Sequence, residues 1–360
     1  MTAGRDTFWR GKRVLVTGHT GFKGAWLSLW LHRLGADVAG YALAPVQTPN
    51  TFVLARLDEI TGSEIADICD RGSLDAAFAR HRPQIVFHLA AQALVRAGYA
   101  EPAATYATNA FGTANVLQAA HASGGVSASV IVTSDKCYDE HAGARRHRED
   151  DPLGGDDPYS ASKACAELIA AALRSTWTGN RETAHMRIAT ARAGNVIGGG
   201  DWSPDRLVPD AVAAFSSHTT LAIRNPSAVR PWQYVLDPVW AYIDLAQRLA
   251  SDDGHRCARA WNFGPPESAE RTVSWVADTL AEMWGDGAAW KKQAGDDPPE
   301  RHMLRLDSSA AAAALAWRTR VDLDRALELT TRWYRSFYDG ASVRALMIDE
   351  IERYERLLAA

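Results

Sequence analysis

Short runs of apolar, often β-branched residues alternate with longer segments of helical periodicity through the first half of the chain. The short runs predict strands and the longer segments predict helices. The expected strands are 13–17, 38–41, 65–68, 85–89, 130–133 and 187–191, and the expected helices are 22–34, 73–81, 103–122 and 158–176. Because such alternation is typical of βαβ units, the pattern predicts an α/β fold of Rossmann type, with a doubly wound parallel sheet.

The pattern changes after about Asn195, where three consecutive glycines, several prolines and several tryptophans interrupt the alternation. Further along the chain, we expect helices at 237–250, 273–284 and 322–339 and a strand at 260–263. Residues 1–194 are expected to form the first domain, to which 235–263 return. Residues 195–234 and 264–360 are expected to form a smaller, mostly C-terminal lobe.

Composition is consistent with a large folded protein. The chain has 360 residues, of which 47% are hydrophobic and 23% are charged. It carries 39 basic and 43 acidic residues, which argues against nucleic acid or an anionic membrane as its main partner. Of the 39 basic residues, 33 are Arg and only six are Lys. A Lys in a motif is therefore more informative than an Arg.

Cysteine spacing and the N-terminus indicate the compartment. The four cysteines lie far apart without a Cys-x-x-Cys pair, which predicts neither a disulfide framework nor a zinc site. The apolar run 14–16 is too short for the core of a signal peptide, and the window 25–43 is interrupted by charged residues. We expect a cytoplasmic protein without a membrane span or a metal site.

Three glycines with a spacing of three residues, Gly18, Gly21 and Gly24, occur where the first expected strand turns into the first expected helix. Glycines at these places allow a tight turn, a close approach of a pyrophosphate to the backbone, and close packing of helix on sheet. An ordinary glycine-rich turn is the alternative. The strand–turn–helix context favours a dinucleotide-binding domain over 1–194.

The form of the dinucleotide is less well defined by the sequence. No Asp or Glu follows the second strand to bind a ribose, and no Arg or Lys lies in the loop 42–45 to bind a 2′-phosphate, so NAD is favoured over NADP by default. Asp67 and Ile68, at the end of the third expected strand, are candidate adenine contacts. A strand-end Asp that caps a turn is an equally good interpretation of Asp67.

A phenol and an ammonium group, Tyr159 and Lys163, lie four residues apart and therefore on one face of the expected helix 158–176. A nearby cation can lower the pKa of a phenol, which ordinarily is about 10, so that it acts as a base. A surface pair is the alternative. The fifth expected strand ends in Ser134, Asp135 and Lys136, and polar groups at this end of a parallel strand face the ligand crevice. A capped loop with an ion pair would explain these three residues as well.

Several strings resemble the extended short-chain dehydrogenase/reductase superfamily: the turn 18–24, the strand end 88–92, Asn109 in the expected helix 103–122, and the Tyr159/Lys163 pair. Within it, the chain resembles the nucleotide-sugar 4,6-dehydratases, in particular those that act on CDP-glucose. The strings 18–24, 133–138, 193–202 and 230–233 carry this finer resemblance, which runs from about Phe8 to the region of Asp307. The dTDP-glucose branch has Thr-Asp-Glu where this chain has Ser134-Asp135-Lys136.

The resemblance implies dehydration of CDP-D-glucose to CDP-4-keto-6-deoxy-D-glucose, with a tightly bound NAD that is regenerated in each cycle. It implies that Tyr159, with Ser134 and Lys163, takes the proton of the C4 hydroxyl. Asp135 is then the acid that protonates the C6 hydroxyl, and Lys136 transfers the C5 proton. Lys136 can do so only if its pKa falls from about 10.4. The second lobe is then the part that binds the nucleotide sugar.

The resemblance also implies the binding residues. The expected cofactor contacts, besides Tyr159 and Lys163, are Gly18, Thr20, Gly21, Phe22, Gly24, Asp67, Ile68, Leu89, Ala90 and Ala91. The expected substrate contacts are Asn195, Arg206, Leu207, Arg230, Trp232 and Asn262. Helices 103–122 and 158–176 each have a second apolar face, and the superfamily pairs these helices, so we expect at least a homodimer.

Three other functions remain open at this stage. A dehydratase for dTDP-glucose or another sugar nucleotide is possible, because no residue outside the family strings identifies a cytosine reader. A nucleotide-sugar 4-epimerase would use Tyr159 and Lys163 but would not need Asp135 and Lys136. A regulator that senses the dinucleotide without turnover can dispense with Tyr159 and Lys163, both of which are present here.

Overall fold

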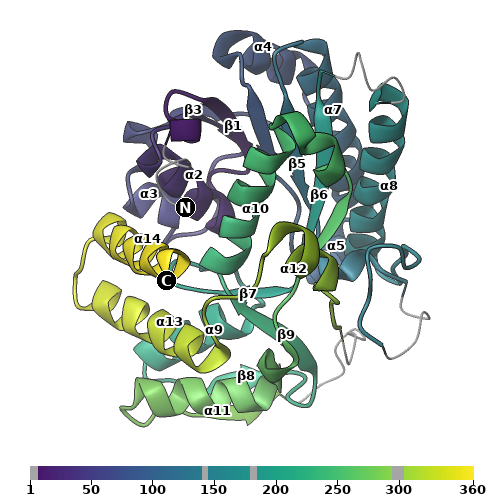
Figure 1. Ribbon diagram of the computed structural model, residues 1–360. Coiled ribbons are helices and arrows are strands. Elements are labelled where there is room, and N and C mark those ends of the chain that lie inside the picture. Colours follow the sequence, from purple (N-terminus) through teal and green to yellow (C-terminus); the bar gives the residue numbers. More distant parts are fainter. Residues whose placement is uncertain (1–6, 140–144, 179–184, 294–303) are drawn as a thin grey trace.

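The larger lobe contains a seven-stranded, fully parallel sheet (Figure 1). The computed structural model describes residues 7–139, 145–178, 185–293 and 304–360. Across the sheet the order is β10-β6-β5-β4-β1-β2-β3. The strands are β1 (Arg13–Thr17), β2 (Asp37–Ala42), β3 (Gly62–Ile65), β4 (Ile85–His88), β5 (Ala128–Val132), β6 (Arg187–Ala193) and β10 (Ala260–Phe263). The predicted doubly wound Rossmann sheet is confirmed.

Helices cover both faces of this sheet (Figure 1). Successive side chains of a strand point to opposite faces, and the apolar side chains on both faces must be buried. On one face, Val14 and Val16 of β1 belong to a core with α2 (Phe22–Arg33) and α10 (Leu236–Leu249). On the other, Leu15 belongs to a core with α4 (Arg71–His81), α7 (Gly112–Ala122) and α8 (Pro158–Thr178). The carboxyl ends of the strands stay uncovered by these two layers.

Two predicted elements differ from the structure. The third strand spans Gly62–Ile65, three residues before the predicted position. It is the edge strand and Ile65 is 54% exposed, so an apolar run does not mark it. The predicted helix 103–122 is α6 (Pro102–Tyr106), a π-helical turn (Ala107–Phe111) and α7 in succession. The short helix α5 (Val95–Ala100) before it was not predicted.

The smaller lobe combines two small sheets with helices (Figure 1). One sheet joins β7 (Asn195–Ile197), β9 (Val229–Tyr234) and β11 (Glu270–Thr272), and the other joins β8 (Leu221–Ile223) and β12 (Trp290–Lys292). Its helices are α9 (Leu207–Ser216), α11 (Val273–Trp284) and α13 (Leu323–Tyr338). Short 3-10 turns span Leu57–Glu59, Asp135–Cys137, Asp252–Cys257 and Glu267–Ala269.

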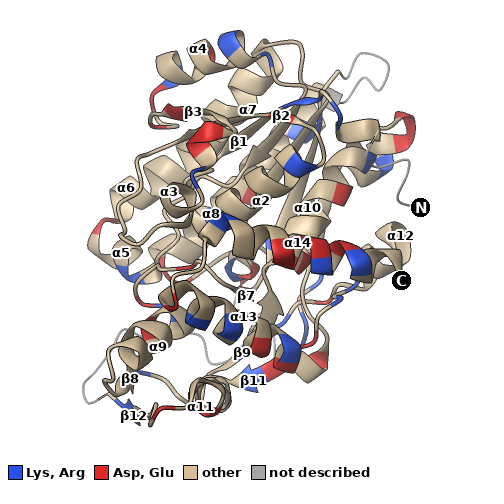
Figure 2. Ribbon diagram, turned by 90° about the vertical axis from the view of Figure 1, so that its left-hand side faces the viewer, with Lys and Arg blue, Asp and Glu red and all other residues tan. Residues whose placement is uncertain are grey.

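The last helix, α14 (Val343–Ala359), was not predicted, and it packs on the larger lobe beside α3 (Thr51–Leu54) and α2. Trp30 of α2 donates to Glu355 at 2.8 Å, and Arg33 pairs with Glu352 at 2.9 Å. Acidic and basic residues are interspersed along its outer face (Figure 2). The short helix α12 (Ser309–Leu315) contacts β10. No helix in the described part of the chain is both long and apolar enough to cross a membrane.

Candidate active site

The glycine turn connects β1 to α2 and presents bare backbone at the start of that helix. Gly18 has a φ of +77°, and a Cβ atom there would lie 2.6 Å from the amide nitrogen of Ala90, so only glycine fits. Gly21 is the N-cap of α2, and the Thr20 hydroxyl donates to the carbonyl of Leu43 at 3.0 Å. A helix N-terminus and glycine backbone that a ligand can approach closely are the features that a dinucleotide pyrophosphate requires, so the turn fits NAD.

His19, inside the turn, is turned away from this surface and stabilises the turn. Its ring is fully buried, packs over Gly40, and shares a 2.7 Å hydrogen bond with Ser63. Burial lowers the pKa of His19 to about 4, so the ring is neutral at pH 7. We therefore interpret His19 as a link between the turn and the neighbouring strands β2 and β3.

A cleft of about 300 Å³ opens at the carboxyl ends of β4, β5 and β6, between the two lobes. It brings together all five expected catalytic residues: Ser134, Asp135, Lys136, Tyr159 and Lys163. It is also lined by eight of the expected binding residues: Phe22, Leu89, Ala91, Asn195, Arg206, Leu207, Arg230 and Trp232. Residues from both lobes therefore meet in one cavity, as a site for a cofactor and a second ligand requires.

Ser134, Asp135 and Tyr159 form a compact hydrogen-bonded group on the cleft wall. Ser134 caps the 3-10 turn that follows β5, where its hydroxyl accepts from the amide of Lys136 at 3.2 Å. The same hydroxyl lies 3.0 Å from the carboxylate of Asp135 and is hydrogen-bonded to Tyr159. All three side chains are buried, with exposed fractions of 4–8%. Their functional groups are thus held in place before a ligand enters.

Burial has different effects on the three titratable groups around the cofactor side of the cleft. It raises the pKa of Tyr159, against the hydrogen bond from Ser134 and the charge of Arg206, which lower it. Burial is the main influence on the pKa of Tyr159, and a contribution of Lys163 to lowering it stays a prediction. Burial also lowers the pKa of Lys163 to about 8 and that of Lys23 to about 7. Positive charge is thus costly in this part of the cleft.

Two expected cofactor contacts lie beyond the cleft, on the side of β3. Asp67 is exposed, and its carboxylate accepts from the amide of Cys69 at 2.9 Å. This bond is the one expected of a strand-end Asp that caps a turn, which was the alternative interpretation of Asp67. Ile68 is buried and contacts Gly112 of α7. Both residues lie near the carboxyl end of β3, so an adenine contact through this segment remains a prediction.

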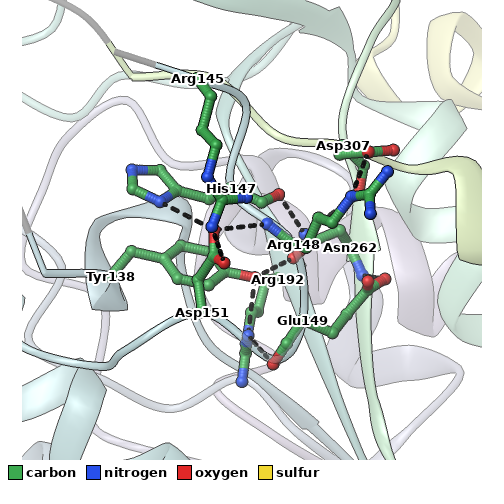
Figure 3. Close-up of polar contacts among 9 residues, drawn as sticks. All are labelled: Tyr138, Arg145, His147, Arg148, Glu149, Asp151, Arg192, Asn262 and Asp307. Atoms are coloured by element: carbon green, nitrogen blue, oxygen red, sulfur yellow. Dashed lines mark hydrogen bonds and ion pairs between the residues drawn. The ribbon is translucent and has the colours of Figure 1, made fainter. Parts of the chain in front are cut away.

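Asn262, an expected substrate contact, lies in a buried polar cluster outside the cleft (Figure 3). Its amide nitrogen donates to the carbonyls of His147 and Asp307 at 2.9 and 3.2 Å, and its oxygen accepts from the Tyr138 hydroxyl at 2.7 Å. The side chain is 0% exposed. Because its hydrogen-bonding capacity is used within the protein, Asn262 ties β10 to the segments around 147 and 307, and its predicted role is corrected to a structural one.

Several charged residues of the cleft were not predicted. Arg96 of α5 and Asp205 form an ion pair of 3.0 Å that joins the two lobes, and Asp205 also faces Arg224 at 3.9 Å. Asp201, 3% exposed, lies 3.6 Å from Arg206. Arg96 lies on the unpredicted helix α5, Asp205 and Arg224 lie outside the helices and strands, and Asp201 lies within the string 193–202 but was not assigned a role. Among the described residues, no cluster of His, Cys, Asp and Glu is arranged to hold a metal ion.

A family model described as GDP-mannose 4,6 dehydratase matches residues 15–330. The chain belongs to this family. Within the GDP-mannose 4,6 dehydratase family, it is similar to the CDP-glucose 4,6-dehydratase of Salmonella typhimurium, at 45% identity over 349 residues, which cover 96% of this chain and 97% of that protein. It is 25% identical to dTDP-glucose 4,6-dehydratase 1 of Escherichia coli, over 90% of this chain and 93% of that one. The family predicted from the sequence motifs is confirmed.

Solved structures agree with this membership in fold. A DesIV double mutant, a dTDP-glucose 4,6-dehydratase from Streptomyces venezuelae with NAD bound, has a TM-score of 0.76 and 25% identity, and the match covers 90% of this chain and 97% of that one. The UDP-glucose 4-epimerase of Thermus thermophilus, in complex with NAD, has the same TM-score at 24% identity and covers 90% and 99%. The fold is therefore shared by dehydratases and epimerases of nucleotide sugars.

Proposed function

We propose that the protein catalyses the NAD-dependent dehydration of CDP-D-glucose to CDP-4-keto-6-deoxy-D-glucose. The strand end Ser134-Asp135-Lys136 supports this most strongly, because it brings an acid and a potential base into the cleft that also holds Tyr159 and Lys163. The 45% identity to a CDP-glucose 4,6-dehydratase over nearly the whole chain favours CDP-glucose over other sugar nucleotides.

Oxidation at C4 is the first step. Tyr159 accepts the proton of the C4 hydroxyl, and Ser134, which is hydrogen-bonded to Tyr159, polarises the same oxygen. Lys163, one helical turn away, provides positive charge that stabilises the phenolate. NAD, when bound at the glycine turn, supplies the hydride acceptor for this step and the hydride that is later returned to C6. The cofactor is regenerated in each cycle.

Elimination of water across C5 and C6 follows, because a ketone at C4 acidifies the proton on C5. Lys136, which is half-buried and lines the cleft, removes this proton, and this role requires the neutral amine. Asp135 gives a proton to the C6 hydroxyl, which leaves as water. Return of the hydride to C6 and of a proton from Lys136 to C5 then saturates the C5–C6 double bond. The carboxylate of Asp135 lies against Gly194 at the bottom of the cleft, and its 4% exposure limits competition from bulk water.

The smaller lobe, 195–234 with 264–360, holds the nucleotide sugar in this proposal, and 1–194 with 235–263 hold NAD. Asn195 and Trp232 are register neighbours in the β7–β9 pair, so both face the cleft from one sheet. The guanidinium groups of Arg206 and Arg230 suit the two phosphates, because Arg recognises phosphate through paired donors. Leu207 begins α9 at the same wall.

We also propose a homodimer formed through the helices 103–122 and 158–176. Phe111 is 69% exposed and Leu168 of α8 is 57% exposed. The π-helical turn that carries Phe111 packs against α8, so the two side chains belong to neighbouring elements. In sedimentation experiments, Leu168→Asp should convert a dimer to a monomer, while an unchanged dimer in that variant would show that another surface is used.

Parallel incubation of the purified protein with CDP-, dTDP-, GDP- and UDP-glucose tests the proposed reaction. Mass spectrometry should show loss of one water from CDP-glucose at a rate well above the other three sugars. Conversion to an isomer of unchanged mass would instead establish a 4-epimerase, and binding of NAD without turnover of any sugar would establish a sensor.

A further inference from the structure

A buried ion pair lies between the catalytic helix and the sheet, and neither of its residues lines the cleft. The carboxylate of Glu167 on α8 accepts from the guanidinium of Arg192 on β6 at 2.7 Å, and both side chains are at most 3% exposed. The Glu167 carboxylate also accepts from the hydroxyls of Thr133 and Thr190 at 2.5 and 2.7 Å. Each oxygen of Glu167 therefore has at least one partner, as a buried carboxylate requires.

Arg192 connects this pair to the segment that follows the catalytic strand end, and Figure 3 shows its contacts with Tyr138 and Glu149. Its guanidinium donates to the hydroxyl of Tyr138 at 2.6 Å and to the carbonyl of Glu149 at 3.2 Å. Tyr138 directly follows the 3-10 turn that carries Asp135 and Lys136. The Glu167 carboxylate, which α8 carries, is thus held in place by partners on β6 and at the end of β5.

Glu167 lies four residues after Lys163, so both side chains occupy one face of α8. Glu167 is the main opposite charge that raises the pKa of Lys163, and the Lys163 ammonium donates weakly to the carbonyl of Val132 at 3.5 Å. The other groups that face Lys163 are Cys137 after β5, His88 on β4 and Lys23 on α2. His88 is neutral, and Lys23 carries a like charge when it is protonated. Neither residue can therefore offset the cost of burying the Lys163 ammonium.

We propose that Glu167, fixed by Arg192, is a positioning residue that keeps the buried Lys163 side chain charged and in place beside Tyr159. This inference rests on the proposed function only for the use to which the charge is put. The pair itself is ordered by contacts that do not touch substrate. Burial alone would favour the neutral amine, and the fixed carboxylate is the group that opposes it.

Two matched variants separate charge from shape. Glu167→Gln keeps the length of the side chain and removes the charge, whereas Glu167→Asp keeps the charge and shortens the side chain. Competitive acetylation of the cofactor-free protein at a series of pH values, followed by peptide mass spectrometry, gives the pKa of Lys163 without any turnover. Lys291 and Lys292, exposed on β12, serve as internal references.

In Glu167→Gln the Lys163 midpoint should fall by about one pH unit or more, since an opposite charge at close range shifts a pKa by one to three units. In Glu167→Asp it should stay within about 0.3 unit of the wild type. A midpoint that stays at the wild-type value in Glu167→Gln would overturn the proposal. If Glu167→Gln does not fold, the aspartate variant decides alone, because a fall of a full unit there would assign the effect to packing and not to charge.

The pH profile of turnover gives a second, separable readout. The alkaline limb of kcat/KM with CDP-glucose should move down with the acetylation midpoint in Glu167→Gln. If acetylation shows the shift and CDP-glucose is not dehydrated by the wild type, the proposed function fails and the role of Glu167 stands. If turnover is normal and neither measurement moves, the role of Glu167 fails alone.

Discussion

Two buried carboxylates on the larger lobe, Glu167 and Asp237, have pKa values that are shifted in opposite directions. Glu167 is 2% exposed, and burial works to raise its pKa, but Arg192 and two hydroxyls outweigh burial and lower it. Asp237 at the start of α10 is 0% exposed and accepts from the Tyr354 hydroxyl and the Arg320 amide, both at 2.7 Å. With these neutral donors, burial raises the pKa of Asp237 to about 7.

The difference follows from what each carboxylate stabilises. Glu167 lies on the catalytic helix α8 and faces the sheet, where its permanent negative charge can act on Lys163. Asp237 lies under α14 and accepts a hydrogen bond from Tyr354 of that helix. A protonated Asp237 can still accept this bond, so protonation does not weaken the packing of α14. Glu350 on α14 resembles Asp237, since burial raises its pKa to about 8 even with Arg332 at 2.9 Å. Ionisation is thus maintained at the chemical site and suppressed at the packing site.

Tyr159→Phe should have the largest effect on the chemical side of this comparison. Removal of the hydroxyl leaves no base at C4, and turnover of CDP-glucose should fall by about 10³-fold. The melting temperature and the retained NAD should change little, because the ring still fills the same space. Full activity in this variant would remove Tyr159 from the mechanism.

Lys136→Ala should separate the two halves of the reaction. C4 oxidation should persist, whereas exchange of the C5 proton with deuterated solvent should slow by about 10²-fold or more. Deuterium incorporation followed by NMR measures this exchange. Unimpaired C5 exchange would assign the proton transfer to another group in the cleft.

Asp237→Asn should affect stability and its pH dependence, with no effect on the chemistry. The raised pKa means that the folded state binds a proton more tightly than the unfolded chain, so the wild type has this contribution below about pH 4 and loses it as pH rises to about 7. Relative to the wild type, Asp237→Asn should gain about 2–4 kcal/mol in the free energy of unfolding between pH 5 and pH 8. Urea unfolding at pH 5 and pH 8 checks this. The same change in the free energy of unfolding between the two pH values in both proteins would contradict it.

Thr190→Val should have the smallest effect. The substitution removes one hydrogen bond to Glu167 and preserves the shape of the side chain, so the free energy of unfolding should fall by about 1 kcal/mol. Turnover at pH 7 should stay near the wild-type value, because Arg192 and Thr133 still hold the carboxylate. A large loss of turnover with little loss of stability would show that Glu167 depends on Thr190 more than on Arg192.

The motif-bearing parts of the fold could be predicted because local sequence determines them. β1 and β10 have the predicted bounds, and the turn from Gly18 to Gly24 and the helix that carries Tyr159 follow from glycine spacing and helical periodicity. The edge strand β3 was misplaced, since none of its residues is fully buried and no apolar run marks it, whereas the other edge strand, β10, is mostly buried. α14 was missed because its stability comes from contacts with α2 and α3, far away in the sequence.

Long-range polar contacts account for the remaining differences. The Glu167–Arg192 pair joins residues 25 positions apart on a helix and a strand, and no spacing rule connects them. Arg192, a charged residue within the strand Arg187–Ala193, was the available signal. Asn262 could not be assigned from sequence either, because a buried and a ligand-binding amide at a strand end have the same sequence context.

The most direct test of the central claim is to follow one isotope. CDP-glucose labelled with deuterium at C4 is incubated with the purified protein, and the product is examined by NMR and mass spectrometry. The proposed cycle transfers that hydride to the cofactor and back within one active site, so the deuterium should appear in the C6 methyl group of a 4-keto product. Deuterium that stays at C4, or that is lost to solvent, would contradict the account.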